Sequence, residues 1–467
     1  MAEPDVGVTP YWELTFDADG DVNGKQRDRL LQQARERGVH DLLVFAHGWN
    51  NDRSIATRLY SRFFEHIPGL APTAHLGYVG VMWPSMRFTD EPIPDFERSV
   101  IPAAPGRPRL DKGTRRALVE VFPDRATVID QISELLDEQP DDDASLAEYG
   151  RLVRLLVEAP AEGPQTGFAE DTLTEGPEGP EGPAGTAGTA GTAGKPRSEP
   201  EMLSGDTAEM CRAFARALAD TAHDGEGAPA PPGPGGAEAA FGLPQLWDGA
   251  HELLRQATYY AMKRRAGTVG ERGLGRTLGQ LAHASPDLRV HLAGHSFGAR
   301  LVSFALRGLP EGVHTVKSVT LLQGAFSHYA FATRLPHNAR GKGALHGQQS
   351  RIDGPLVCCF SRFDSALGTL YPLASRMAGD DSSAAGLGLP RLLGAKWGAL
   401  GHNGVQAVEG TKKLTLAEAL RTKLPTSGVV NIDAASVVKR GGPPSGAHSD
   451  ICHRELAQVV LAAGRVR

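Results

Sequence analysis

The feature that most constrains the fold is a strand, helix and strand pattern between residues 41 and 83. Residues 42–45 (LLVF) form an unbroken apolar run, which is typical of a parallel strand buried on both faces. Apolar residues at helical spacing follow over 53–67, and a second apolar run covers 77–83 before Pro84. Two strands joined by a helix in this way predict a βαβ unit and a mostly parallel sheet.

The same alternation returns in the last third of the chain. We expect strands at 288–294, 316–325, 354–361 and 427–434, and a closing helix near 449–464. The sequence therefore predicts an α/β fold with a doubly wound sheet and helices on both faces. Its core is built from two parts, residues 1–85 and 286–467.

Residues 86–285 separate these two parts. Their sequence predicts an insert that contains a loop, helices and disordered segments. Residues 87–113 are rich in proline and read as a lid loop, and several amphipathic helices follow. The last of these helices, 243–265, is expected to pack on the sheet. Residues 160–202 and 223–241 carry Gly-Pro-Glu, Thr-Ala-Gly and proline repeats with little to bury, so both are expected to be disordered.

The charge and the cysteines of the chain argue against a nucleic-acid-binding protein and against a disulfide-stabilised secreted protein. A net charge of −6 over 467 residues gives no basic field for a nucleic acid. The first ten residues lack the features of a secretory signal, and we find no apolar run of about 18 residues that would span a membrane. Cys358 and Cys359 are adjacent in a strand pattern and so point to opposite faces. We expect no disulfide framework and a cytoplasmic location.

Ser296 is the candidate nucleophile. It stands at the centre of GHSFG (294–298), where an apolar strand turns into a helix, which is the setting of a nucleophile elbow. A serine hydroxyl needs a base, a group that holds the base, and amide donors for the oxyanion. Gly48 follows an earlier strand in FAHGWNN, and we expect the main-chain N–H groups of Trp49 and Phe297 to be the two donors.

The acid and the base are expected in later loops. Asp364 is the first acidic residue after the strand 354–361 and is the candidate acid, with Asp353 and Asp450 as rivals. His448 lies just before the last helix and is the candidate base. The rival histidines are His453 and His402.

The segments AHGWN, GHSFG, SRFD and GAHSD, in this order, resemble those of the α/β-hydrolase superfamily. The resemblance covers about 10–85 and 286–467. The motif sequences FAHGWNN and LAGHSFGA are similar to those of an uncharacterised bacterial group of serine hydrolases or peptidases. The resemblance implies hydrolysis of a small-molecule carboxylic ester, or of an amide or thioester, through an acyl-enzyme, with no cofactor. The long insert before the nucleophile strand departs from the superfamily pattern. The alternative is a scaffold or binding protein without catalysis.

Other polar residues near these motifs have simpler interpretations. His47 and His295 are expected to be structural, and Arg300 to be a solvated helix residue rather than a contact for an anionic substrate. His448, Cys452 and His453 do not share one helical face, so we expect no zinc or other metal site. TAGTAGTAGKP follows no strand and lacks the spacing of a phosphate loop, so we expect no nucleotide site.

Overall fold

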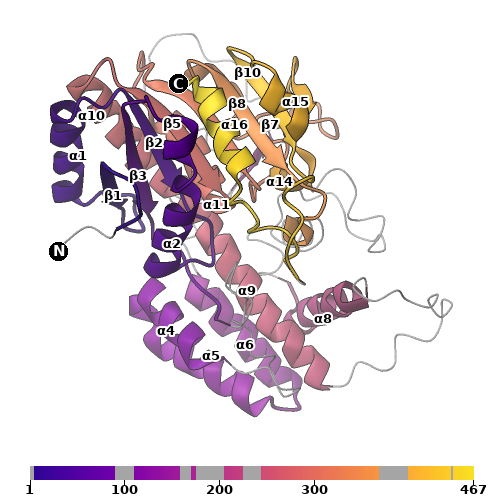
Figure 1. Cartoon of the computed structure of the whole chain (residues 1–467). Helices are drawn as coiled ribbons and strands as arrows, with labels where there is room; N and C mark the ends of the chain where they lie inside the picture. The colour runs from indigo at the N-terminus through magenta and orange to yellow at the C-terminus, as the bar shows by residue number, and fades with distance from the viewer. Residues whose placement is uncertain are drawn as a thin grey trace, which may run out of the picture.

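An eight-stranded sheet forms the centre of the molecule, and every neighbouring pair of its strands is parallel (Figure 1). The computed structural model describes residues 5–89, 110–157, 170–174, 205–223, 243–367, 398–442 and 445–467. The predicted α/β class with a mostly parallel sheet is confirmed. In spatial order the strands are β1 (Tyr11–Thr15), β3 (Leu76–Met82), β2 (Asp41–Ala46), β5 (Arg289–His295), β6 (Val316–Leu322), β8 (Pro355–Phe360), β10 (Gly428–Asp433) and β9 (Lys412–Thr415).

Helices cover both faces of this sheet, as the sequence predicts. On one face the apolar core lies under α1 (Gly24–Glu36), α10 (Arg276–Ala284) and α11 (Phe297–Gly308). On the other face it lies under α2 (Arg53–Phe64), α3 (Ile67–Leu70), α15 (Leu416–Arg421) and α16 (Arg454–Gly464). Cys358 and Cys359 belong to opposite cores, and both thiols are free.

The order of the strands reverses between β2 and β5. After β2 the chain continues to β3, toward one edge of the sheet, whereas after β5 it continues to β6, toward the other edge. The helices that follow, α2 and α11, accordingly pack on opposite faces. Parallel sheets bind their ligands beyond the carboxyl ends of the strands at such a switch point. The loops after β2 and β5 hold Trp49 and Ser296.

The insert contributes a group of helices that lies beside the sheet (Figure 1). They are α4 (Lys112–Val121), α5 (Ala126–Glu138), α6 (Asp143–Val157), α8 (Thr207–His223) and α9 (Leu243–Thr268), and a π-helical turn, Val269–Gly275, leads on to α10. The expectation that residues 243–265 pack on the sheet is corrected. Helix α9 packs chiefly on α8, α11 and α6, because α11 already covers that face.

One part of a segment expected to be disordered is ordered. Strand β4 (Thr172–Thr174) pairs antiparallel with β7 (Gly341–Gly343). Next to it, the carboxylate of Asp171 is buried between Arg300 and Lys263, which gives this piece of the insert a fixed place. Most of 160–202, nearly all of 223–241 and residues 90–109 of the predicted lid lie outside the described residues.

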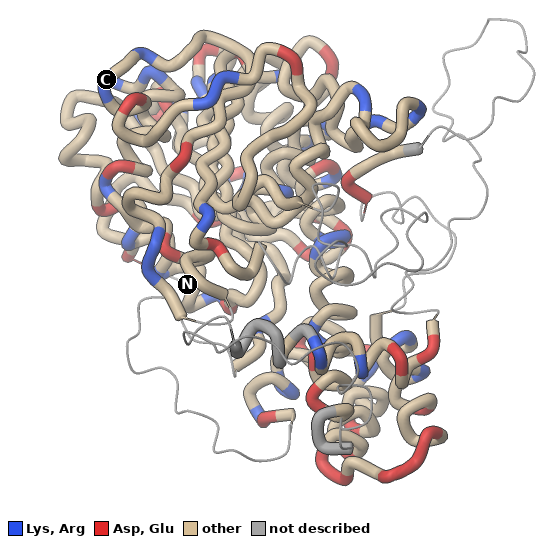
Figure 2. Tube along the Cα trace, turned by 90° about the vertical axis from the view of Figure 1, so that its right-hand side faces the viewer, with Lys and Arg blue, Asp and Glu red and all other residues tan. Residues whose placement is uncertain are grey.

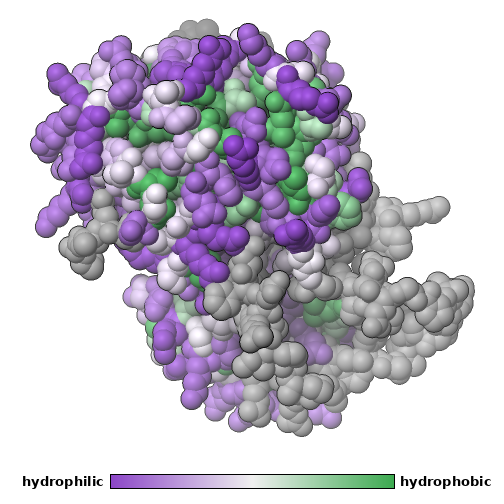
Figure 3. All heavy atoms as spheres, viewed as in Figure 1, coloured by the Kyte–Doolittle hydropathy of each residue, from purple (hydrophilic) through white to green (hydrophobic). Residues whose placement is uncertain are grey.

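The surface of the described part shows no field of one sign. Figure 2 shows basic and acidic residues mixed along the core, with acidic residues gathered at the far end of the helical group. Figure 3 shows apolar residues in short strips between hydrophilic ones. Within the described ranges, no helix combines the length and the apolar character that crossing a bilayer requires.

Candidate active site

Ser296 occupies a strained turn between β5 and α11. Its φ of 55° and ψ of −120° are unusual for a residue with a side chain. Three main-chain hydrogen bonds hold it there. Its N–H donates to Leu322 O at 3.1 Å, and its carbonyl accepts the N–H of Ala299 at 3.1 Å and that of Ala325 at 3.2 Å. Such strain persists only where the surroundings enforce it, and it is commonest at functional sites.

Three glycines allow this turn to form. A Cβ on Gly294 would lie 2.3 Å from Gly298 O, and a Cβ on Gly298 would lie 2.0 Å from Ala46 O at the end of β2. A Cβ on Gly48 would lie 2.6 Å from the Cβ of Ser296. The loop after β2 therefore touches the serine directly, because no side chain separates the two backbones.

The structure brings Ser296, His448 and Asp364 together in one hydrogen-bonded chain. His448 Nε2 is 2.9 Å from Ser296 Oγ, and His448 Nδ1 is 2.8 Å from Asp364 Oδ2. Since a carboxylate only accepts, Nδ1 carries the proton and Nε2 is left to accept the proton of the serine hydroxyl. The serine residue is only 4% exposed and the carboxylate of Asp364 is fully buried.

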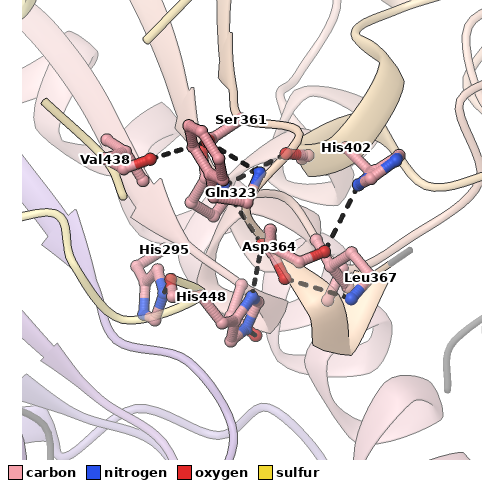
Figure 4. A network of polar contacts seen from close by, with 12 residues as sticks. His295, Gln323, Ser361, Asp364, Leu367, His402, Val438 and His448 are labelled. Atoms are coloured by element: carbon pink, nitrogen blue, oxygen red, sulfur yellow. Dashed lines mark hydrogen bonds and ion pairs between the residues drawn. The ribbon is translucent and has the colours of Figure 1, made fainter. Parts of the chain in front are cut away.

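Two further donors fix the carboxylate of Asp364 (Figure 4). Gln323 Nε2 donates to Oδ2 at 3.0 Å, and the N–H of Leu367 donates to Oδ1 at 3.0 Å. Gln323 is 1% exposed, has a φ of 47°, and also donates to Gly401 O at 3.1 Å. The role of this glutamine could not be predicted from the sequence, because Gln323 meets Asp364 only through the pairing of β6 and β8.

The rival acids and histidines lie in other contacts. Asp353 binds Lys317 at 2.7 Å on the surface. Asp450 accepts from His453 Nε2 at 2.9 Å, and this hydrogen bond, partly opposed by burial, raises the pKa of His453. His402 Nδ1 lies 3.3 Å from the main-chain oxygen of Asp364, so this histidine contacts the backbone of the acid and not its carboxylate.

The two expected oxyanion donors lie next to Ser296. Phe297 is the next residue, and Trp49 follows Gly48, which touches the serine. Among the described residues, no hydrogen bond engages the main-chain N–H of Trp49 or of Phe297. The N–H of His47, in contrast, donates to Tyr60 Oη at 3.1 Å. Neither N–H group is therefore taken up by an acceptor in the described part of the chain, which leaves both available to an oxyanion.

His47 and His295 act as neutral, buried hydrogen-bonding groups. His295 Nε2 donates to the main-chain oxygen of His448 at 2.9 Å, which ties the elbow to the loop of the base. Burial, together with the nearby His448, lowers the pKa of His295 to about 3. His47 Nδ1 donates to Gly48 O at 2.9 Å, and burial lowers its pKa to about 4.

These depressed pKa values predict a loss of stability in acid. Between pH 6.5 and about 3 the unfolded chain binds a proton at residue 295 that the folded chain does not. Stability therefore falls as the pH drops through this window. From pH 7 to pH 5, His295 is expected to cost about 2 kcal/mol of unfolding free energy.

Urea unfolding of His295→Gln at both pH values measures this cost. Between pH 7 and pH 5 the free energy of unfolding of the variant should fall by about 2 kcal/mol less than that of the wild type. His346→Gln is the matched control, because His346 is exposed and its loss should leave the wild-type pH dependence unchanged. An equal loss in the wild type and in His295→Gln would show that His295 is already protonated in the folded protein.

Arg300 corrects a prediction, because it is buried and not solvated. Its guanidinium forms an ion pair with Asp171 and donates to Lys263 O at 3.0 Å and to Glu170 O at 3.1 Å. Lys263 Nζ binds the other oxygen of Asp171 at 2.8 Å. Burial opposes ionisation of Asp171, but Arg300 and Lys263 lower its pKa overall. A buried charge requires such pairing, so Arg300 joins the insert to α11 and is not placed to bind an anionic substrate.

A second set of Ser, His and Asp residues lies at the opposite end of the strands. His291 Nε2 is 2.8 Å from Asp41 Oδ1, and His291 Nδ1 is 3.0 Å from Ser318 Oγ. Ser318 is fully buried within β6, with no turn or helix start beside it. These three residues therefore join β2, β5 and β6, and Ser318 serves as a built-in comparison for Ser296.

Within the described ranges, no group of three or more His, Cys, Asp or Glu side chains is arranged to hold a metal ion. Comparisons with family models, with curated proteins and with solved structures found no match to this chain. The geometry of the site is therefore the basis on which a function is inferred for this chain.

Proposed function

We propose that this chain is a serine hydrolase of the α/β-hydrolase type, which cleaves a carboxylic ester through an acyl-enzyme. The observation that carries the proposal is the hydrogen-bonded chain from Ser296 Oγ through His448 to Asp364, at a strained turn between a strand and a helix. A scaffold without catalysis has no need for this chain or for the strain at Ser296.

The same contacts support each step of ester hydrolysis. Ser296 Oγ attacks the carbonyl carbon while its proton passes to His448 Nε2, and Asp364 stabilises the imidazolium. The N–H groups of Trp49 and Phe297 bind the oxyanion of the tetrahedral intermediate. Collapse of the intermediate breaks the bond to the alcohol, which leaves with the proton of His448. Water, deprotonated by His448, then attacks the acyl-enzyme and releases the acid and Ser296.

Labelling with a fluorophosphonate probe tests the nucleophile. The wild type should be modified on the peptide that contains Ser296, and Ser296→Ala should not react. Ser318→Ala is the matched control, because it removes the other serine that binds a histidine and should still be labelled. Labelling of Ser296→Ala at the wild-type rate would contradict the proposal.

A further inference from the structure

Helix α9 of the insert places one side chain against three loops of the site. The ring of Tyr259 packs on Phe297 with ring centres 4.4 Å apart, and on Trp49 with ring centres 5.1 Å apart in an edge-to-face arrangement. Its hydroxyl lies 3.4 Å from the main-chain oxygen of Ala325 and donates to it. These three residues follow β5, β2 and β6, so Tyr259 contacts all three loops at once.

Each of these three partners has a direct part in the site. Trp49 and Phe297 carry the two candidate oxyanion N–H groups, and no hydrogen bond engages either of them in the described part of the chain. The N–H of Ala325 donates to the main-chain oxygen of Ser296 at 3.2 Å. Tyr259 thus contacts both candidate oxyanion donors and a residue that holds the elbow.

Helix α9 is itself held in place close to this contact. One turn after Tyr259, Lys263 accepts a hydrogen bond from Arg300 Nε through its main-chain oxygen at 3.0 Å, and its ammonium group binds Asp171. Arg300 and Phe297 both belong to α11. The position of the Tyr259 ring relative to the start of α11 is therefore fixed by a buried ionic contact.

We propose that Tyr259 is a positioning residue of the oxyanion hole, so that the insert completes the site instead of only covering it. This inference rests on the proposed function. The N–H groups of Trp49 and Phe297 lie in two different loops, and their separation depends on the packing of both side chains on one ring. An oxyanion hole works only when its donors are held in advance at the right distance.

The effect of losing the ring follows from this role. Removal of one oxyanion donor lowers kcat by about 10²–10³, and loosening both without removing either should lower it by about 10–10². The oxyanion exists only in the transition state and the intermediate, so KM should stay within a few-fold. Tyr259→Phe keeps both ring contacts and should retain most of the wild-type kcat.

The test compares Tyr259→Ala, Tyr259→Phe and the wild type with p-nitrophenyl butyrate as substrate. A trifluoromethyl ketone, whose adduct with a serine mimics the oxyanion, should bind Tyr259→Ala more weakly by the factor lost in kcat/KM. Tyr260→Ala is the matched control, since it removes the same side chain from the next position of α9, which faces a different direction. If Tyr259→Ala does not fold, Tyr259→Leu replaces it, with a smaller loss of kcat expected.

The outcomes separate this inference from the proposed function. A Tyr259→Ala or Tyr259→Leu enzyme with wild-type kcat, beside an inactive Ser296→Ala, would overturn the role of Tyr259 and leave the hydrolase intact. A rise in KM at unchanged kcat would also overturn it, because the ring would then contact substrate and not position the donors. A wild type with neither turnover nor labelling at Ser296 would contradict the proposed function itself.

Discussion

Asp364→Asn is expected to lower kcat for p-nitrophenyl butyrate by about 10⁴, with little change in KM. The carboxylate accepts three hydrogen bonds, from His448, Gln323 and Leu367, and has no contact with water. An asparagine offers one oxygen and one NH₂ group to these three donors, so at least one donor must face another. The neutral amide also no longer stabilises the imidazolium of His448 when it takes the serine proton.

Asp353→Asn is the control for this substitution. The sequence offers Asp353 as an alternative candidate acid, but this residue lies on the surface and binds Lys317. Its loss should therefore leave kcat within about twofold of the wild-type value. A kcat of Asp364→Asn within a few-fold of the wild type would show that another acid orients His448.

The strands could be predicted from the sequence because a parallel strand in the centre of a sheet is buried on both faces and is therefore mostly apolar. All six residues of β2 are buried, and so are all seven of β3. The edge strand β9 lacks this signature. β9 (Lys412–Thr415) reads KKLT and is mostly exposed, and the three-residue strands β4 and β7 are too short for a periodic pattern.

The order of the candidate site residues along the chain was also readable, because each follows a recognisable strand or precedes the last helix. Ser296, Asp364 and His448 do meet in the structure. The groups that hold them could not be found in this way. Gln323 and Tyr259 reach the site from 41 and 37 residues away from Asp364 and Ser296 respectively, through packing of β6 and of α9.

Arg300 was expected to be exposed to solvent, but a partner far away in the sequence buries it. An arginine in the first turns of an amphipathic helix normally points to solvent, and nothing near it in the sequence suggests a partner. Its partner, Asp171, lies 129 residues earlier, inside a segment whose composition predicts disorder. The pairing of this carboxylate with two cations from other elements depends on the tertiary structure, and the composition of the segment cannot predict it.

Gly298→Ala is expected to lower the unfolding free energy by about 3 kcal/mol and to abolish hydrolysis of p-nitrophenyl butyrate. The added methyl group would lie 2.0 Å from Ala46 O and 2.6 Å from His47 O. Both atoms are main chain at the end of β2, in the middle of the sheet, so neither can move aside cheaply. Helix α11 must shift instead, which carries Phe297 away from Trp49 and Ser296 away from His448.

Gly24→Ala is the matched control, because Gly24 also lies in the first turn of a helix but the nearest atom to its added Cβ is 3.8 Å away. Urea unfolding and steady-state kinetics on both variants measure the two effects. Wild-type activity in Gly298→Ala would mean that the loop after β2 does not touch the elbow as described. The oxyanion donors would then have to come from elsewhere, because Trp49 belongs to the loop that Gly48 and Gly298 allow to lie against Ser296.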